Sequence, residues 1–241
     1  MRIRLMLIAA ALLLFTGALA LATAQEPADS KAEVPALASF HEVIYVIWHE
    51  AWPAKDTARL KELLPEVERK AAEVQAARLP GILHNREDAW REGVAALKNV
   101  VEEYRAAVQA NDNPGLLSAA EKLHAQFEKL ARSLRPAVKE LEDFHSTLYL
   151  LYHHYLPDYQ IDNIRRASAE LSQKMPALLA ATLPQKLSDK KEAFDKARQE
   201  LATAVNGLAA VVASGDEATV RKAVEEVHSR YEAAAATVGE H

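Results

Sequence analysis

Apolar residues recur every three to four positions along most of this chain, and short polar turns interrupt the pattern. This spacing is that of amphipathic helices. Only 7 of the 241 residues are glycine, which agrees with long helices and few turns. The pattern predicts helices over about 35–52, 56–78, 85–110 and 114–133, followed by a second set of four after residue 136.

The pattern of residues 40–134 repeats, without a gap, 104 positions later. The segment FHEVIYVIWH at 40–49 aligns with FHSTLYLLYH at 144–153, so that Phe, His, Tyr and His coincide. The first segment is β-branched enough for a strand, but its Leu-rich counterpart favours helix for both. Roughly a quarter of the residues are identical in the two copies, yet three histidines of each copy coincide.

Each copy, about 100 residues long, holds four predicted helices joined by short loops. Short loops between long helices require antiparallel neighbours, as in an up-down-up-down bundle. We therefore predict an all-α fold, a tandem duplication of an up-down-up-down four-helix bundle, with copy 1 over 35–135 and copy 2 over 136–241. The short junction at Arg135 and Pro136 predicts that the two units pack against each other.

Residues 1–24 have the form of a secretory signal peptide, with two arginines, an apolar run and small residues before Gln25. We predict cleavage after Ala24, a flexible leader over 25–34 and a periplasmic location. The alternative is an uncleaved anchor, because the apolar run approaches the ~18 residues that can span a bilayer. No second apolar segment of that length follows, so no stable membrane insertion is expected after cleavage.

The remaining composition narrows the possible ligands. Removing the signal peptide takes away two Arg and no acids, which leaves 27 basic and 34 acidic residues and changes the net charge from −5 to −7. Mixed charges with an acidic excess argue against nucleic-acid or anionic-lipid binding. The absence of cysteine excludes disulfides, thiolate metal sites and covalent haem attachment. Met175 is the single methionine left, which argues against a Met-rich copper(I) carrier.

Three histidines of each copy are candidate metal ligands. His41 lies on a helical stripe with Tyr45, and His49 lies beside that stripe two turns further along. Glu121 and His124 share one face of the fourth helix. The first and fourth helices are neighbours in such a bundle, so His41, His49 and His124 can converge. Copy 2 repeats the set with His145, His153, Glu225 and His228.

Neutral imidazoles on facing helices suit copper, zinc, nickel or iron. Di-iron bundles need two Glu-x-x-His motifs and two further Glu, whereas each copy here has one such motif. We therefore predict one mononuclear site per copy, with Glu121 and Glu225 as ligands or as groups that orient an imidazole. The alternative is that these histidines are structural. His84, His154 and His241 have no histidine counterpart in the other copy and are expected to have no metal role.

An exported four-helix unit with candidate ligands on its first and last helices resembles the cytochrome b562/cytochrome c′ class of bundles. In b-type members, one ligand on the first helix and a His near the end of the last helix hold the haem. His41 and His145 match the first position. His124 and His228 depart from the pattern, because they lie about ten residues before the helix end. The resemblance implies haem b, between His41 or His49 and His124 in copy 1, as an alternative cofactor.

These observations predict an exported protein that sequesters or buffers a divalent transition metal at one His-rich site per bundle. A b-type haem electron carrier and a cofactor-free helical interaction or chaperone module are the alternatives. The sequence contains no nucleophile motif, Gly-rich phosphate loop or His-Glu-x-x-His motif. We therefore expect no enzymatic activity, and no particular protein partner is indicated.

Overall fold

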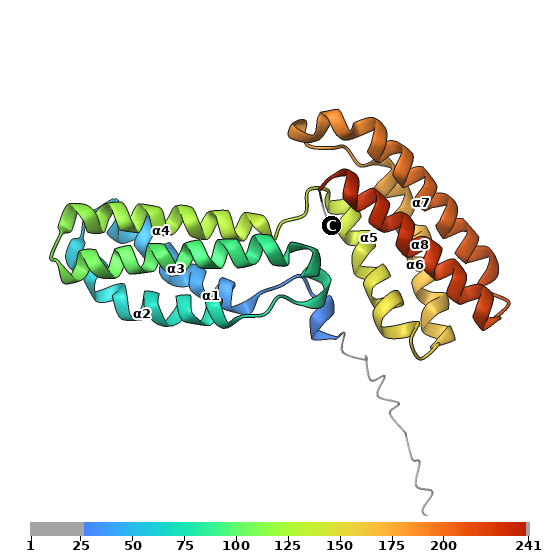
Figure 1. Ribbon diagram of the computed structural model, residues 1–241, viewed down its shortest axis with the longest axis horizontal. Coiled ribbons are helices and arrows are strands. Elements are labelled where there is room, and N and C mark those ends of the chain that lie inside the picture. The colour runs from blue at the N-terminus through green and yellow to red at the C-terminus, as the bar shows by residue number, and fades with distance from the viewer. Residues whose placement is uncertain (1–26, 240–241) are drawn as a thin grey trace, which may run out of the picture.

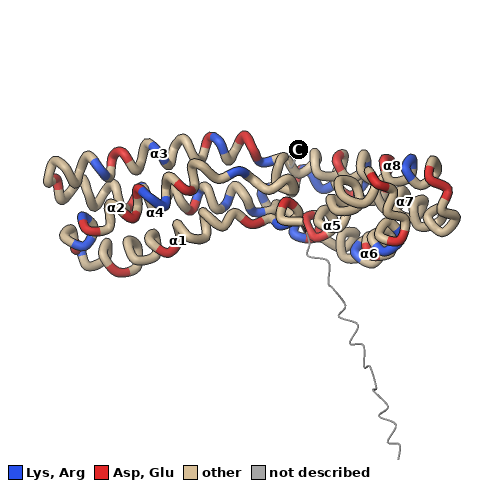
Figure 2. Tube along the Cα trace, turned by 90° about the horizontal axis from the view of Figure 1, so that it is seen from below, with Lys and Arg blue, Asp and Glu red and all other residues tan. Residues whose placement is uncertain are grey.

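The computed structural model describes residues 27–239, and the predicted signal peptide at 1–24 lies outside the described residues. This part of the chain forms eight α-helices and no strand, which confirms the predicted all-α class (Figure 1). None of the helices in residues 27–239 is both long enough and apolar enough to cross a lipid bilayer. Basic and acidic residues are interspersed along most of the helices, although residues 35–46 contain no Lys or Arg (Figure 2).

The first four α-helices lie side by side and share one hydrophobic core (Figure 1). We call residues 27–134 the first unit. Phe40, Leu60, Leu97 and Leu123, one from each helix, are fully buried in this core. The helices and the shorter 3₁₀ (η1, η3) and π (η2) elements are η1 (Ala28–Ser30), α1 (Pro35–Val46), η2 (Ile47–Ala51), α2 (Thr57–Ala76), η3 (Gly81–Arg86), α3 (Glu87–Gln109) and α4 (Asn113–Ser133).

The last four α-helices form a second set around a separate core (Figure 1). We call residues 138–239 the second unit. Phe144, Leu171, Leu201 and Val224, again one from each helix, are fully buried. Its elements are α5 (Lys139–Tyr149), the π-helix η4 (Leu150–Tyr155), α6 (Ile161–Ala180), the 3₁₀-helix η5 (Gln185–Lys190), α7 (Lys191–Val211) and α8 (Glu217–Thr237).

The helix boundaries follow local signals in the sequence. Aspartates 56, 112 and 216 each accept a hydrogen bond from a backbone N–H of the first turn that follows, as N-cap residues do. The third predicted helix, 85–110, begins two residues late, at Glu87, because residues 81–86 form a 3₁₀-helix after Pro80. The first predicted helix, 35–52, is α-helical to Val46 and then continues as a π-helix.

Special backbone features recur at the same offset as the sequence pattern. Lys55 and Tyr159, 104 residues apart, both have a positive φ, of 53° and 45°. Asn111 and Gly215 also lie 104 residues apart, with φ of 58° and 70°. The two π-helices occupy overlapping equivalent positions. The units are therefore similar in local backbone conformation as well as in sequence pattern.

A lysine on the second helix of each unit is fixed to the first helix in the same way. Lys70 Nζ donates to the backbone oxygen of Ser39 at 2.7 Å and to Glu42 Oε2 at 2.6 Å. Its equivalent, Lys174, donates to the backbone oxygen of Asp143, also at 2.7 Å. The bond from Lys70 lowers the pKa of the Glu42 carboxyl. These bonds hold the first and second helices of each unit in register.

The two units are packed against each other at one end of the first unit. Tyr149, from α5, joins the hydrophobic core of the first unit and donates a hydrogen bond to Asp29 Oδ2 at 3.1 Å. Arg86 of η3 forms an ion pair with Glu142 of α5 at 3.5 Å. Asp29 belongs to the stretch 25–34 that we expected to be a flexible leader. Its described part, from residue 27, contains the short helix η1 and contacts the second unit.

Candidate metal site

In the first unit, the three candidate histidines lie along the seam between the first and fourth helices, each against an aromatic ring. The ring of His41 stacks on Phe127, with centroids 5.1 Å apart and planes 6° from parallel. His124 stacks on Trp48, with centroids 4.0 Å apart and planes at 4°. The ring of His49 lies 4.5 Å from that of Tyr45. These stacks join α4 to α1 and η2.

The second unit repeats these ring pairs at the equivalent positions. His145 stacks on Tyr231 at 4.6 Å and 12°. His228 stacks on Tyr152 at 3.8 Å and 12°. His153 lies 4.5 Å from Tyr149, at an interplanar angle of 38° against 40° in the first unit. The local geometry of the candidate site is therefore the same in both units, although the partner ring changes from Phe to Tyr or from Trp to Tyr.

The sequence produces this arrangement through helix periodicity. Residues three and four apart share a helix face, so His41 and Tyr45 lie on one stripe of the first helix. His49 and His153 each lie inside a π-helix, in η2 and η4. Short π-helical stretches are rare and occur often at functional sites. The π-helices therefore mark the same part of each unit that the histidines do.

In the first unit the site is open to solvent. His41 and His49 are exposed, and the side chain of Tyr45 is 51% exposed. His124 is half-buried, and burial is the main cause that lowers its pKa. The nearby His49 and His41 lower the pKa of His124 further, whereas Glu128 opposes the shift. The three imidazoles are thus close enough for their charges to interact.

In the second unit part of the site is covered, although His153 is exposed. His145 is only 6% exposed, and burial lowers its pKa to about 3, with smaller contributions from His84, His228 and His153. Burial also lowers the pKa of His153. These imidazoles are therefore neutral at neutral pH, and the neutral ring is the form that binds metal ions.

The carboxylates of the Glu-x-x-His motifs do not lie where a metal ligand would. Glu121 is exposed and has no hydrogen bond or ion pair to His124 in the described structure. Glu225 accepts a hydrogen bond of 3.0 Å from the hydroxyl of Tyr152, which in turn stacks on His228. The carboxylate nearest His228 is Glu232, with 3.7 Å between Oε2 and Nδ1. In this arrangement Glu225 lies where the predicted orienting group would be, whereas Glu232 is the carboxylate closer to the His228 ring.

A fourth histidine, which the sequence interpretation treated as a comparison residue, lies at the second site. His84, in η3 of the first unit, lines a cleft of about 270 Å³ together with His145, His153 and His228. The repeat alignment could not reveal His84, because its counterpart is Ser188 and its neighbours in the cleft come from the other unit. Only the packing of one unit on the other brings it there.

The donors fit a divalent transition metal in kind and number, because each unit offers three imidazoles on one seam. Within residues 27–239, however, no three His, Asp or Glu side chains stand close enough to hold one ion as they are placed. The rings of His153 and His228, for example, are 6.4 Å apart and nearly perpendicular. The exposed side chain of His153 must therefore rotate before His153 and His228 can bind the same metal ion.

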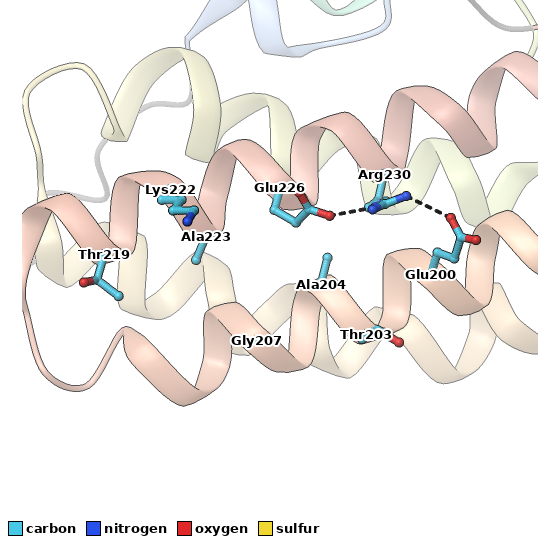
Figure 3. Close-up of a pocket in the computed structure, with 9 residues that line it drawn as sticks. All are labelled: Glu200, Thr203, Ala204, Gly207, Thr219, Lys222, Ala223, Glu226 and Arg230. Carbon is cyan, nitrogen blue, oxygen red and sulfur yellow. Dashed lines mark hydrogen bonds and ion pairs between the residues drawn. The ribbon is translucent and has the colours of Figure 1, made fainter.

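A second concave surface lies between α7 and α8 and has different chemistry. This groove has a volume of about 540 Å³ and small residues such as Ala204 and Gly207 line it. Arg230 bridges Glu226 of its own helix and Glu200 of α7, at 2.7 and 2.9 Å (Figure 3). Because its lining contains no histidine and these two carboxylates are both paired with Arg230, it offers no comparable metal ligands.

The comparisons of this chain with protein-family models, with characterised proteins and with solved structures found no match. The function must therefore be inferred from the chemistry of the two histidine seams.

Proposed function

We propose that this chain is an exported, periplasmic protein that sequesters or buffers a divalent transition metal at one histidine site in each of two duplicated four-helix bundles. The sites consist of His41, His49 and His124 in the first bundle and His145, His153 and His228 in the second. The observation that carries the proposal is the repetition of all three histidines, with the same ring contacts, in both units.

This repetition favours a ligand over a purely structural role. The equivalent histidines keep the same ring contacts but differ in burial, since His41 is exposed and His145 is buried. Roughly three quarters of the residues have diverged between the copies. A requirement for imidazole nitrogen itself explains why both environments keep the same three side chains.

The donor chemistry narrows the class of metal. Imidazole nitrogen suits zinc, copper, nickel and iron, whereas calcium and magnesium prefer oxygen ligands. Burial keeps His124, His145 and His153 neutral at lower pH than usual, so protons compete less with the metal. Glu225, through Tyr152, is assigned an orienting role at the second site, as a supporting partner rather than a ligand.

The test is elemental analysis by mass spectrometry of the mature protein, purified from periplasm without chelators. The comparison is a His124→Ala/His228→Ala double variant, with His154→Ala as a control that removes a histidine outside the site. We expect up to two equivalents of zinc, copper, nickel or iron in the parent and in the control, and a large loss in the double variant. A parent protein that carries no metal and takes up none on addition would refute the proposal.

The same preparation tests the haem alternative. A Soret absorption band lost in the double variant would establish b-type haem instead of a bare metal ion. In the first unit, Phe40 and Leu123 are fully buried in the adjacent core, so haem binding between α1 and α4 would require these helices to separate. The proposal assigns no catalysis to either site, and a turnover that disappears with His124→Ala would contradict it.

A further inference from the structure

We propose that the second metal site is a four-histidine site shared between the two units, in which His84 of the first unit joins His145, His153 and His228 of the second. The inference rests on the proposed metal-binding function and adds a ligand that has no counterpart in the first site. With His84 as an additional ligand, the two sites of the chain differ in the number of ligands and in metal affinity.

Four imidazoles from three separate stretches of the described chain line this cleft, although their side chains must rotate before three or more of them can share one ion. His84 comes from η3, His145 and His153 from α5 and η4, and His228 from α8. His84 acts on the pKa of both His145 and His153, which places it within electrostatic range of both rings. The repeat pattern alone could not predict this shared cleft, because η3 belongs to the other unit.

The hydrogen bonding of His84 leaves the correct nitrogen available. Its Nδ1 lies 3.1 Å from the backbone oxygen of Gly81. A carbonyl oxygen can only accept, so Nδ1 donates to it, and in the neutral ring Nε2 then keeps its lone pair. Metal-bound histidines commonly donate their second ring N–H to a backbone carbonyl, which fixes the tautomer and the orientation of the ring. His84 already has this arrangement.

Close packing positions His84. A Cβ atom at Gly81 would lie 2.0 Å from the hydroxyl oxygen of Tyr149, so only glycine allows η3 to approach α5 this closely. Tyr149 is held by Asp29, and Arg86 at the end of η3 pairs with Glu142. The loop that carries His84 is therefore anchored on both sides of the histidine.

The first site has no equivalent fourth ligand. The counterpart of His84 in the second unit is Ser188, in η5. The counterpart of Tyr149 is Tyr45, which is 51% exposed, so the segment that covers Tyr149 has no equivalent over Tyr45 among the described residues. Four imidazoles fit the tetrahedral coordination of Zn²⁺, whereas three leave one position open. We therefore expect the second site to bind Zn²⁺ more tightly than the first.

The experiment is a competition titration of the metal-free mature chain with Zn²⁺ against a chromophoric chelator. The variants are His84→Ala, His228→Ala and His124→Ala, with His154→Ala as the matched control, because His154 lies next to His153 but outside the cleft. His84 is exposed, so its replacement leaves the fold intact. We expect His84→Ala to weaken the tighter site about tenfold or more and to leave the weaker site unchanged.

The other variants separate failure of this inference from failure of the proposed function. If His228→Ala removes the tighter site and His84→Ala changes neither affinity, His84 is not a ligand but the metal-binding function stands. If the unmodified chain binds no Zn²⁺, both proposals fail. Hydrogen exchange gives a further readout: Zn²⁺ should slow exchange of the amides at 81–86 in the parent and in His124→Ala, but not in His84→Ala. Unchanged exchange at 81–86 in the parent would overturn the shared site.

Discussion

Tyr45 and Tyr149 occupy equivalent positions in the two units, yet Tyr45 is 51% exposed and Tyr149 is 6% exposed. Both rings lie between the same two histidines of the first helix, and their ring contacts are nearly identical. The difference comes from outside the second unit, because η3 of the first unit covers Tyr149. A repeated sequence can thus keep one local arrangement and place it in two different environments.

A few substitutions explain why the covering occurs in only one direction. Gly81, which allows the close approach to Tyr149, corresponds to Gln185 in the second unit. The equivalent of Arg86 is Lys190, and the equivalent of Glu142 is Ala38, so the ion pair cannot form in the opposite direction. The segment η5 therefore has neither a glycine that allows close approach to Tyr45 nor the ion pair that would hold it over the first seam. The interface between the units is consequently asymmetric.

The largest expected difference between the units concerns the first histidine of each seam. His145→Ala removes a buried ring that stacks on Tyr231, and we expect a loss of about 2–4 kcal/mol in the free energy of unfolding. His41→Ala removes an exposed ring, and we expect a change within about 0.5 kcal/mol. Urea unfolding of the metal-free protein measures both values. Equal losses would mean that the covering of the second seam does not bury His145.

Acidification should also affect the second unit more strongly. The pKa of His145 is about 3 in the folded chain and 6.5 in the reference state, so between these values the unfolded chain binds a proton that the folded chain does not. The contribution of His145 to the free energy of unfolding is therefore fully present above pH 6.5 and is lost as the pH falls towards 3. At pH 4.5 we expect a loss of about 2–3 kcal/mol from this group. Urea unfolding at several pH values, with His145→Gln as the control, measures it; a variant as pH-dependent as the parent would contradict the assignment.

The close approach of η3 gives the next prediction. Gly81→Ala introduces a methyl group against the hydroxyl of Tyr149, and we expect a destabilisation of about 1–3 kcal/mol from overpacking. The matched control is Gln185→Ala, at the equivalent exposed position of η5, which should have almost no effect. Thermal unfolding measures both. Adding Tyr149→Phe to Gly81→Ala removes the clashing oxygen and should recover part of the loss, and no recovery would place the strain elsewhere.

The smallest expected effect concerns the two tyrosine hydroxyls. Tyr149→Phe removes the hydrogen bond to Asp29 and should cost about 1 kcal/mol. Tyr45→Phe, at the exposed equivalent, should leave stability unchanged within about 0.5 kcal/mol. Tyrosine fluorescence and urea unfolding of the two variants check the difference. A larger loss for Tyr45→Phe would indicate a contact at the first seam that the described chain does not supply.

Much of the fold could be predicted from the sequence because its causes are local. The apolar periodicity predicted the α-helices to within a few residues at most ends, and Asp112 and Asp216 begin α4 and α8 as N-caps. The π-helices and the 3₁₀-helix at 81–86 were not predicted, since they differ from an α-helix only in which carbonyl each N–H reaches. Periodicity over a few residues does not distinguish these patterns.

The sequence by itself determined which histidines share a seam, because helix periodicity and the 104-residue repeat both act along one chain. The tertiary structure alone decided which seam is covered, which carboxylate lies near His228 and that His84 enters the second cleft. These features depend on how closely two helical surfaces approach, and that distance is set by single residues such as Gly81 in combination with Tyr149. Such pairs lie far apart in sequence and do not follow the repeat, so no pattern within one copy could reveal them.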